Sequence, residues 1–143
     1  MAARPFWAGH IEYVPFYTGD ELPCLYTGMT RLPNENARMF YLLAQKITPG
    51  DDDPVIFYLS GGPGHSGLKD FFFEVGPLIM SKPDDFVITD AVASWTEVAN
   101  VVFVDNPVNT GFSYADYLVK NSTRTGQDFI HFMVEFFKMY PQL

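Results

Sequence analysis

Residues 55–68 read VIFYLSGGPGHSGL, and the change of pattern inside them organises the rest of the chain. The first five residues are β-branched, aromatic or aliphatic, which is typical of a buried strand. The glycines that follow allow a tight exit from the strand, because they have no Cβ. Their bare N–H groups can form an anion site. Residues 67–75 then indicate a helix, so the loop lies where open α/β sheets bind ligands.

The composition is that of a chain with a buried core. A length of 143 residues suits one domain, and 48% apolar residues exclude intrinsic disorder. The net charge of -8 argues against nucleic acid and anionic membranes as partners, since both are bound through basic patches. No apolar run approaches the ~18 residues of a membrane span. The first residues lack the apolar stretch of a signal peptide.

Two further stretches predict buried strands. Residues 100–107 read NVVFVDNP, a continuous apolar run typical of a parallel sheet covered on both faces. Residues 37–46 read ARMFYLLAQK, which suits a strand or a helix; the flanking turns and the aromatic residues favour a strand. Residues 10–30 predict a loose β-hairpin. Residues 86–88 form a short strand candidate.

A long helix is predicted at the end of the chain. Its N-cap is Ser122 or Thr123, and Pro141 stops it. Apolar residues fall on one face: Phe129, Phe132, Met133, Phe136, Phe137 and Tyr140. The other face carries Asp128, Glu135 and Lys138. This order of hairpin, strands and helices indicates an α/β domain.

The residues alone leave the chemistry of the glycine loop open. The N–H groups of Gly61 and Gly62 suit an oxyanion site, although a plain strand-to-helix turn explains them equally well. Ser66 and Ser113 both depart from the G-x-S-x-G pattern of a nucleophile. No cluster has the spacing of metal ligands, so we expect no metal and no cofactor. The single cysteine, Cys24, is interpreted as a small core residue.

Three stretches together resemble the serine carboxypeptidases, a family with the α/β-hydrolase fold. Residues 58–77 read YLSGGPGHSGLKDFFFEVGP, where the family wording is close to WLNGGPGCSSLxGxFxExGP. Residues 95–115 read WTEVANVVFVDNPVNTGFSYA, against WxxxANxxFxDQPVGTGFSYS. Residues 128–141 read DFIHFMVEFFKMYP, against DxxxFLxxFFxxFP. The motifs occur in the family's order and span most of residues 37–141.

The resemblance implies an α/β class and an incomplete α/β-hydrolase fold. Residues 1–143 would form the N-terminal part of a single domain, with the first strands of its mixed sheet, the oxyanion loop and the first helices. In the family the nucleophile lies in GESYAG, on the strand after the last predicted helix. We therefore expect the nucleophile strand and the Ser/Asp/His triad to be missing, and this chain to be inactive alone.

The resemblance also implies roles for residues of the loop. Gly62 would be the oxyanion donor. The substrate's C-terminal carboxylate would lie against Tyr58, Ser60, Gly61, Gly62 and Glu74. Family members recognise this carboxylate with a carboxyl pair that shares a proton, because like charges at close range do not both ionise cheaply. Their activity is therefore favoured by acid.

The chain departs from the family wording at several of these positions. This chain has Tyr58 where the family has a tryptophan, and Ser60 where the family has an asparagine. His65 stands in place of a cysteine that forms a disulfide in the family. The change from Asn to Ser shortens a hydrogen-bonding arm. Lys69 adds a positive charge near the loop, and we hypothesise that it compensates.

The resemblance predicts release of C-terminal residues from peptides by acyl-enzyme chemistry in the full-length parent. Two alternatives remain open: a non-catalytic relative that binds a peptide or partner, and an acyltransferase of the same family. Peptide or protein C-termini are the expected substrates. Self-association is also expected, through the exposed edge of strand 55–60. By resemblance the compartment is lysosomal, vacuolar or extracellular, and in a secreted chain Asn121 is a glycosylation candidate.

Overall fold

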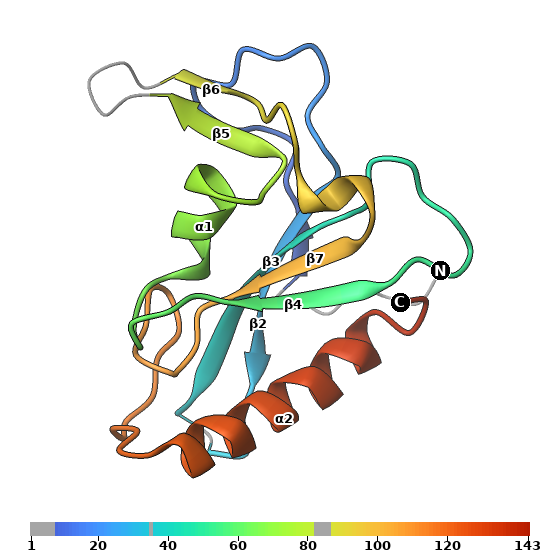
Figure 1. Ribbon diagram of the computed structural model, residues 1–143. Helices are drawn as coiled ribbons and strands as arrows, with labels where there is room; N and C mark the ends of the chain where they lie inside the picture. Colours follow the sequence, from blue (N-terminus) through green and yellow to red (C-terminus); the bar gives the residue numbers. More distant parts are fainter. Residues whose placement is uncertain (1–7, 35, 82–86) are drawn as a thin grey trace.

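A computed structural model describes residues 8–34, 36–81 and 87–143. They form a central sheet with a helix on each face (Figure 1). The strands, in spatial order, are β1 (Ala8–His10), β2 (Leu25–Arg31), β3 (Arg38–Ala44), β7 (Asn100–Val104) and β4 (Val55–Leu59). Neighbours are antiparallel except β4 and β7, which run parallel. The sheet is therefore mixed, and among the described strands its one parallel pair, β4 and β7, carries the glycine loop.

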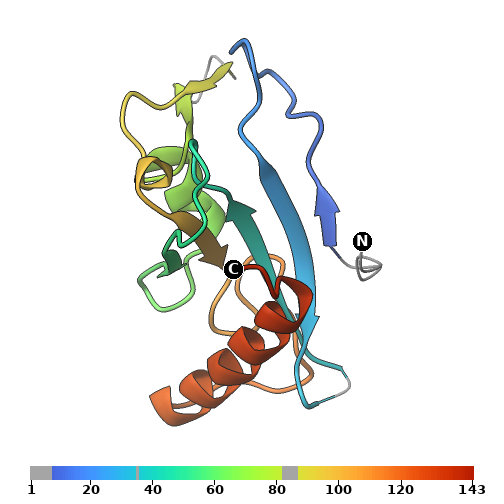
Figure 2. The same ribbon diagram turned by 90° about the vertical axis from the view of Figure 1, so that its right-hand side faces the viewer.

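Helix α2 (Ser122–Met139) covers one face of the sheet (Figure 2). Side chains alternate between the faces of a strand, and Tyr41 of β3 and Phe57 of β4 both point toward α2. Their rings lie 5.3 and 5.4 Å from that of Phe136, in edge-to-face geometry. Such aromatic pairs add about 0.5–1.5 kcal/mol each beyond the area they bury. This aromatic layer holds α2 on the sheet.

Helix α1 (Gly67–Phe73) covers the other face, together with a two-stranded sheet of β5 (Leu78–Ser81) and β6 (Val87–Asp90). A short 3-10 helix, η1 (Trp95–Glu97), leads into β7. The Phe71 ring of α1 lies 5.3 Å from that of Phe103 on β7. The two faces thus have separate cores, with β7 buried between them.

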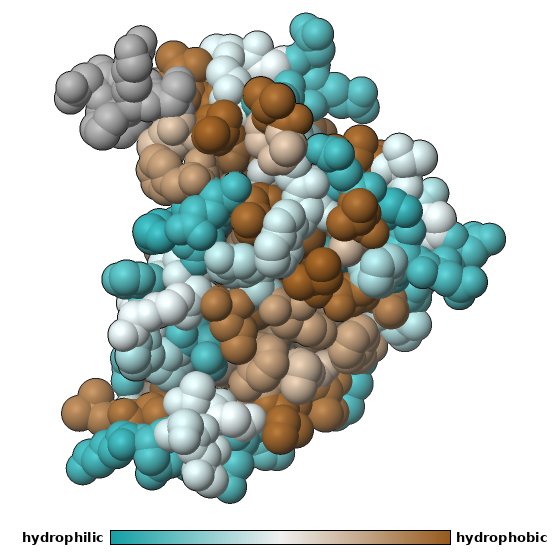
Figure 3. All heavy atoms as spheres, viewed as in Figure 1, coloured by the Kyte–Doolittle hydropathy of each residue, from teal (hydrophilic) through white to brown (hydrophobic). Residues whose placement is uncertain are grey.

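Strand β4 is the last strand of the described sheet. It pairs with β7 through residues such as Tyr58 and Phe103, and no further strand of the described residues flanks it. Leu59 is exposed there, and so are three residues of α2: Ile130, Val134 and Phe137. Figure 3 shows apolar side chains gathered over β4 and α2 on this side of the molecule. The strand predicted at residues 55–60 therefore lies at an edge of the described sheet, as expected, and its neighbour there is β7.

The structure corrects several local expectations. The N-cap of α2 is Asn121, whose Oδ1 accepts from the Arg124 N–H at 2.9 Å, and neither Ser122 nor Thr123. The hairpin expected over residues 10–30 becomes the β1–β2 pair, whose register starts at Ala8. The strand expected at residues 86–88 is β6, and Phe86 lies outside the described residues.

Asp128 was expected on the solvent face of the last helix, and this is wrong. The residue is only 2% exposed. Its carboxylate accepts from the Tyr117 hydroxyl at 2.9 Å and from Arg124 Nε at 3.0 Å. These two partners lie before and at the start of α2, and they compensate the cost of burying the charge.

Candidate functional site

The glycine loop connects the end of β4 to the start of α1. Gly62 has a φ of +121° and Gly64 a φ of +109°, values that residues with a Cβ rarely adopt. The peptide bond between Gly62 and Pro63 is cis. The carbonyl of Gly61 accepts from the N–H of His65 at 3.2 Å, which closes the turn. The two glycines at positive φ are required by this path of the backbone.

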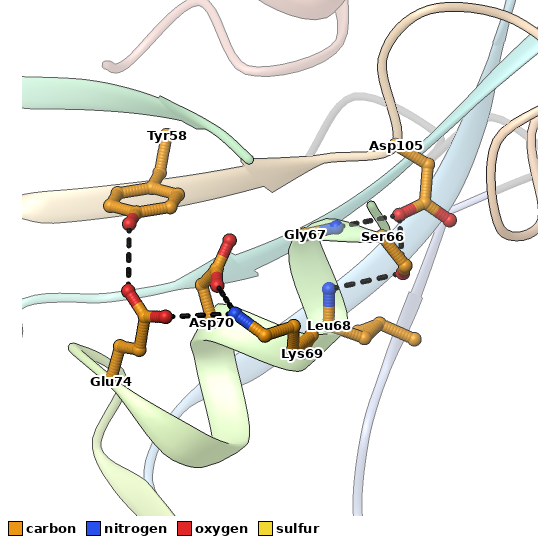
Figure 4. A network of polar contacts seen from close by, with 8 residues as sticks. All are labelled: Tyr58, Ser66, Gly67, Leu68, Lys69, Asp70, Glu74 and Asp105. Atoms are coloured by element: carbon orange, nitrogen blue, oxygen red, sulfur yellow. Dashed lines mark hydrogen bonds and ion pairs between the residues drawn. The ribbon is translucent and has the colours of Figure 1, made fainter. Parts of the chain in front are cut away.

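Asp105, at the end of β7, fixes the start of α1. Its Oδ1 accepts from the Ser66 hydroxyl at 2.6 Å and from the Gly67 N–H at 2.9 Å (Figure 4). Its Oδ2 accepts from the Phe112 N–H at 2.8 Å. The Ser66 oxygen in turn caps the helix by accepting from the Leu68 N–H at 3.2 Å. The carboxylate thus ties the glycine loop to the loop that follows β7.

A polar cluster lies on α1 next to the glycine loop (Figure 4). The Tyr58 hydroxyl, on β4, donates to Glu74 Oε2 at 3.3 Å. Lys69 Nζ donates to Glu74 Oε1 at 2.8 Å and to Asp70 Oδ1 at 3.0 Å. Trp95 lies against this cluster, with its ring 5.5 Å from that of Tyr58.

Asp70 is the buried member of the cluster, at 2% exposure. Burial alone would raise its pKa. The hydrogen bond from Ser60 and the neighbouring Lys69 ammonium outweigh burial, so the pKa of Asp70 is lowered. The pKa of Lys69 is raised, first by its hydrogen bond to Glu74 and then by Asp70. Both carboxylate contacts therefore favour the charged form of Lys69. Burial together with the neighbouring Asp70 and Glu74 raises the pKa of Tyr58.

The structure brings together most of the residues that the sequence selected. Tyr58, Ser60 and Glu74 meet in the polar cluster, and Gly61 and Gly62 follow directly in the loop. Asp70 was missed. The signal that could have identified it is the family wording itself, which carries a glycine at that position, so an aspartate there needed an explanation.

The two serines considered as nucleophiles, Ser66 and Ser113, and the single cysteine, Cys24, lie outside the polar cluster. The Ser66 hydroxyl donates to Asp105. Ser113 is 4% exposed, and its Oγ donates to the Asp105 carbonyl at 2.6 Å and accepts from the Phe40 N–H at 2.8 Å. Cys24 is exposed, with Sγ 3.8 Å from His10 Nε2, so its interpretation as a core residue is wrong. Both serines have structural hydrogen bonds.

No three His, Cys, Asp or Glu side chains among the described residues converge as metal ligands. No helix within the same residues has the length and apolar character to cross a bilayer.

Comparison with known proteins gives concordant matches. Residues 21–143 match the sequence model of the serine carboxypeptidase family. The chain is 37% identical over 132 residues to carboxypeptidase Y from Candida albicans, covering 92% of this chain and 24% of that protein. It is 36% identical over 117 residues to carboxypeptidase Y homolog A from Pyrenophora tritici-repentis, covering 82% of this chain and 21% of that protein.

A solved structure shows the same fold. The crystal structure of Kex1(delta)p, a prohormone-processing carboxypeptidase from Saccharomyces cerevisiae, superposes with a TM-score of 0.72 at 22% identity, over 83% of this chain and 28% of that chain. This likeness confirms the predicted α/β-hydrolase class, with the first strands of the mixed sheet, the glycine loop and the first helices. The chain spans about a quarter of the length of the curated relatives it matches.

Proposed function

This chain belongs to the serine carboxypeptidase family, and we propose that it supplies the oxyanion loop and the carboxylate-binding side of a site that releases C-terminal residues from peptides. The family is one of hydrolases. In this proposal the Gly62 N–H stabilises the oxyanion of the tetrahedral intermediate. Tyr58, Ser60, Gly61 and Glu74 hold the terminal carboxylate. The nucleophile, its base and the base's acidic partner come from the part of the family fold that follows these residues.

The observation that carries the proposal is the way β7 positions the glycine loop. Asp105 bonds both Ser66 and Gly67, so α1 starts at a fixed place beside the carboxyl ends of β4 and β7. Ligands of open α/β sheets bind outside the carboxyl ends of the strands. The Tyr58–Glu74 contact lies at the same edge. In this proposal one rigid support thus holds the oxyanion donor and the carboxylate-binding group.

A chimeric enzyme tests this proposal. This chain replaces the matching quarter of Candida albicans carboxypeptidase Y, and the rest of that enzyme provides the reacting groups. We expect the chimera to hydrolyse an N-blocked dipeptide with a free C-terminal carboxylate, and its C-terminal amide far more slowly. A folded chimera that cleaves neither peptide, or both at equal rates, would contradict the proposal.

Glycine variants of the chimera separate catalysis from folding. Gly62→Ala keeps the N–H but places a Cβ at a φ of +121°, which forces the backbone to move and displaces that donor. We expect kcat to fall by roughly 10²–10³-fold, as for loss of one oxyanion donor. Gly126→Ala is the matched control. Gly126 lies in α2, and an added Cβ there meets nothing within 4 Å. Its kcat is expected to equal that of the unmodified chimera.

The exposed edge favours a second candidate, in which the chain binds a partner by strand addition to β4. The apolar side chains beside this edge, Leu59 among them, give such a partner a surface to cover. Self-association of two copies through β4 is the simplest form of this candidate. The acyltransferase alternative is separated by offering the chimera a small alcohol as acyl acceptor and measuring ester formation.

A vacuolar, lysosomal or extracellular location completes the proposal. Asn121 is exposed and caps α2 through Oδ1, which leaves its side-chain nitrogen as the atom that would carry a glycan. Expression of the parent through a secretory pathway, with a mobility shift that glycosidase removes in the wild type and that is absent in Asn121→Gln, tests both points.

A further inference from the structure

Lys69 has unused hydrogen-bonding capacity beside the glycine loop. Its ammonium group has three N–H donors. Two of them are used, by Asp70 Oδ1 at 3.0 Å and Glu74 Oε1 at 2.8 Å. The side chain is 49% exposed, so the third donor is open to a ligand from solvent. Figure 4 shows the nitrogen between the two carboxylates.

The two carboxylates hold Lys69 with different strength. The Asp70 side chain is 3% exposed and also accepts from Ser60, so it cannot leave Lys69 without losing a partner in a dry environment. The Glu74 side chain is 45% exposed, and an ion pair so open to solvent is weak because water competes for both charges. The pair with Asp70 is therefore the permanent one, and the pair with Glu74 can be exchanged.

We infer that Lys69 is a specificity-determining residue of the proposed site: its ammonium group binds the terminal carboxylate of a peptide, while Asp70 holds it in place. This inference rests on the proposed function. An incoming carboxylate takes the third donor and displaces or shares the contact with Glu74. The Tyr58 hydroxyl, which donates to the other oxygen of Glu74, keeps that side chain beside the site. No bond is made or broken in this step.

The inference has a consequence for pH. The titratable groups that face Lys69 are Asp70 and Glu74 on α1 and Tyr58 on β4. The hydrogen bonds to Glu74 and Asp70 raise the pKa of Lys69, so its ammonium group keeps its charge at pH 8. The contact between Lys69 and a peptide carboxylate therefore needs no proton shared between carboxyl groups. Binding of a free carboxylate should then persist at pH 8, where a site that depends on a protonated carboxyl would fail.

Fluorescence of Trp95 gives a direct binding test in the chain itself. With Trp7→Phe as background, Trp95 is the remaining tryptophan, 5.5 Å from Tyr58 by ring centroids. The probes are N-acetyl-Ala-Leu and its C-terminal amide, each titrated at pH 5 and pH 8. We expect the acid to bind about tenfold more tightly or better, as for one charge-assisted hydrogen bond, at both pH values.

Variants of Lys69 test whether this lysine causes the tighter binding of the acid than of the amide. Lys69→Met should bring the two probes to within about twofold of each other at pH 8, whereas Lys69→Arg should keep part of the preference. Lys138→Met removes an exposed lysine paired with Glu135 on α2 and should keep all of it. The inference is overturned if the wild-type chain binds the acid and the amide equally, or if it binds neither probe. It is also overturned if Lys69→Met still prefers the acid to the amide.

The chimera separates failure of this inference from failure of the proposed function. Peptide hydrolysis with the same KM in the wild type and in Lys69→Met overturns the inference and leaves the proposed function standing. A chimera that does not hydrolyse peptides, while the isolated chain binds the acid through Lys69, overturns only the proposed function.

Discussion

The Ser66 hydroxyl lies 2.6 Å from Oδ1 of Asp105, although the two residues are 39 positions apart in the chain. Ser66 caps α1 and ends the glycine loop, while Asp105 directly follows the last residue of β7. The same carboxylate also accepts from the Gly67 N–H, and through its second oxygen from the Phe112 N–H. One buried aspartate therefore sets the position of both loops at the carboxyl edge of the parallel strands.

Asp105→Ala should destabilise the chain by about 3–5 kcal/mol, because it removes three hydrogen bonds and leaves the buried Gly67 N–H unpaired. Asp105 is 1% exposed, so water does not readily replace the carboxylate. The measurement is the free energy of unfolding in urea. Ser66→Ala removes one of these bonds and the cap of α1, and it should cost only about 1–2 kcal/mol. Equal losses in the two variants would contradict the central role given to Asp105.

Two glycines should respond to alanine in opposite directions. Gly126 lies in the interior of α2 with open space around its Cβ position, so Gly126→Ala should stabilise the chain by about 0.5–1 kcal/mol. A Cβ on Gly76 would collide with the carbonyl oxygen and ring of Phe71, so Gly76→Ala should destabilise it. Thermal unfolding followed by circular dichroism measures both. A lower Tm for Gly126→Ala would show that α2 is not continuous at that residue.

The sequence predicts those elements whose signal is local. Strands β4 and β7 are apolar runs and α2 has a helical period, and all three occur where they were predicted. Strand β5 was missed, since it has only four residues and forms by pairing with β6, as in Leu78 with Asp90. Such pairing depends on contacts distant in sequence, which a local pattern does not contain.

The residues of the candidate site also fall into two groups: those that a sequence motif identifies, and those whose role depends on tertiary contacts. The glycine loop and Glu74 were found because they belong to a motif with fixed spacing. Asp70 escaped because its role depends on Ser60 and Lys69 folding around it, and burial of a carboxylate is not visible in a helical pattern. Asp128 was misplaced for the same reason, since Tyr117 and Arg124 satisfy its charge. Buried charges are thus the residues that sequence patterns placed least well here.

Tyr17 should make the stability of the chain sensitive to alkaline pH. The pKa of Tyr17 is raised to about 12 from an unfolded value of 10.0. Partial burial is the largest cause, and the hydrogen bond to Asp90 is the second. A raised pKa means that the protonated tyrosine stabilises the fold fully below about pH 10, and that this contribution is lost as the pH rises through about 12. Unfolding free energies measured from pH 8 to 12 should fall more steeply for the wild type than for Tyr17→Phe. Tyr13→Phe, at a residue 76% exposed, should follow the wild type.

The exposed side of α2 next to β4 should drive self-association. Ile130, Val134 and Phe137 lie on one stripe of the helix and are 58%, 49% and 40% exposed, beside a strand edge with unpaired backbone groups. Sedimentation velocity should show concentration-dependent association of the wild type. Val134→Lys should shift the chain toward monomer, because an ammonium group is costly to bury in such a contact. His131→Lys adds a charge on the side of α2 that lies near Leu32 and Pro33, away from β4, and should leave association unchanged. A wild-type chain that stays monomeric at high concentration and unfolds in one sharp, reversible transition would show that this side is stable without a partner.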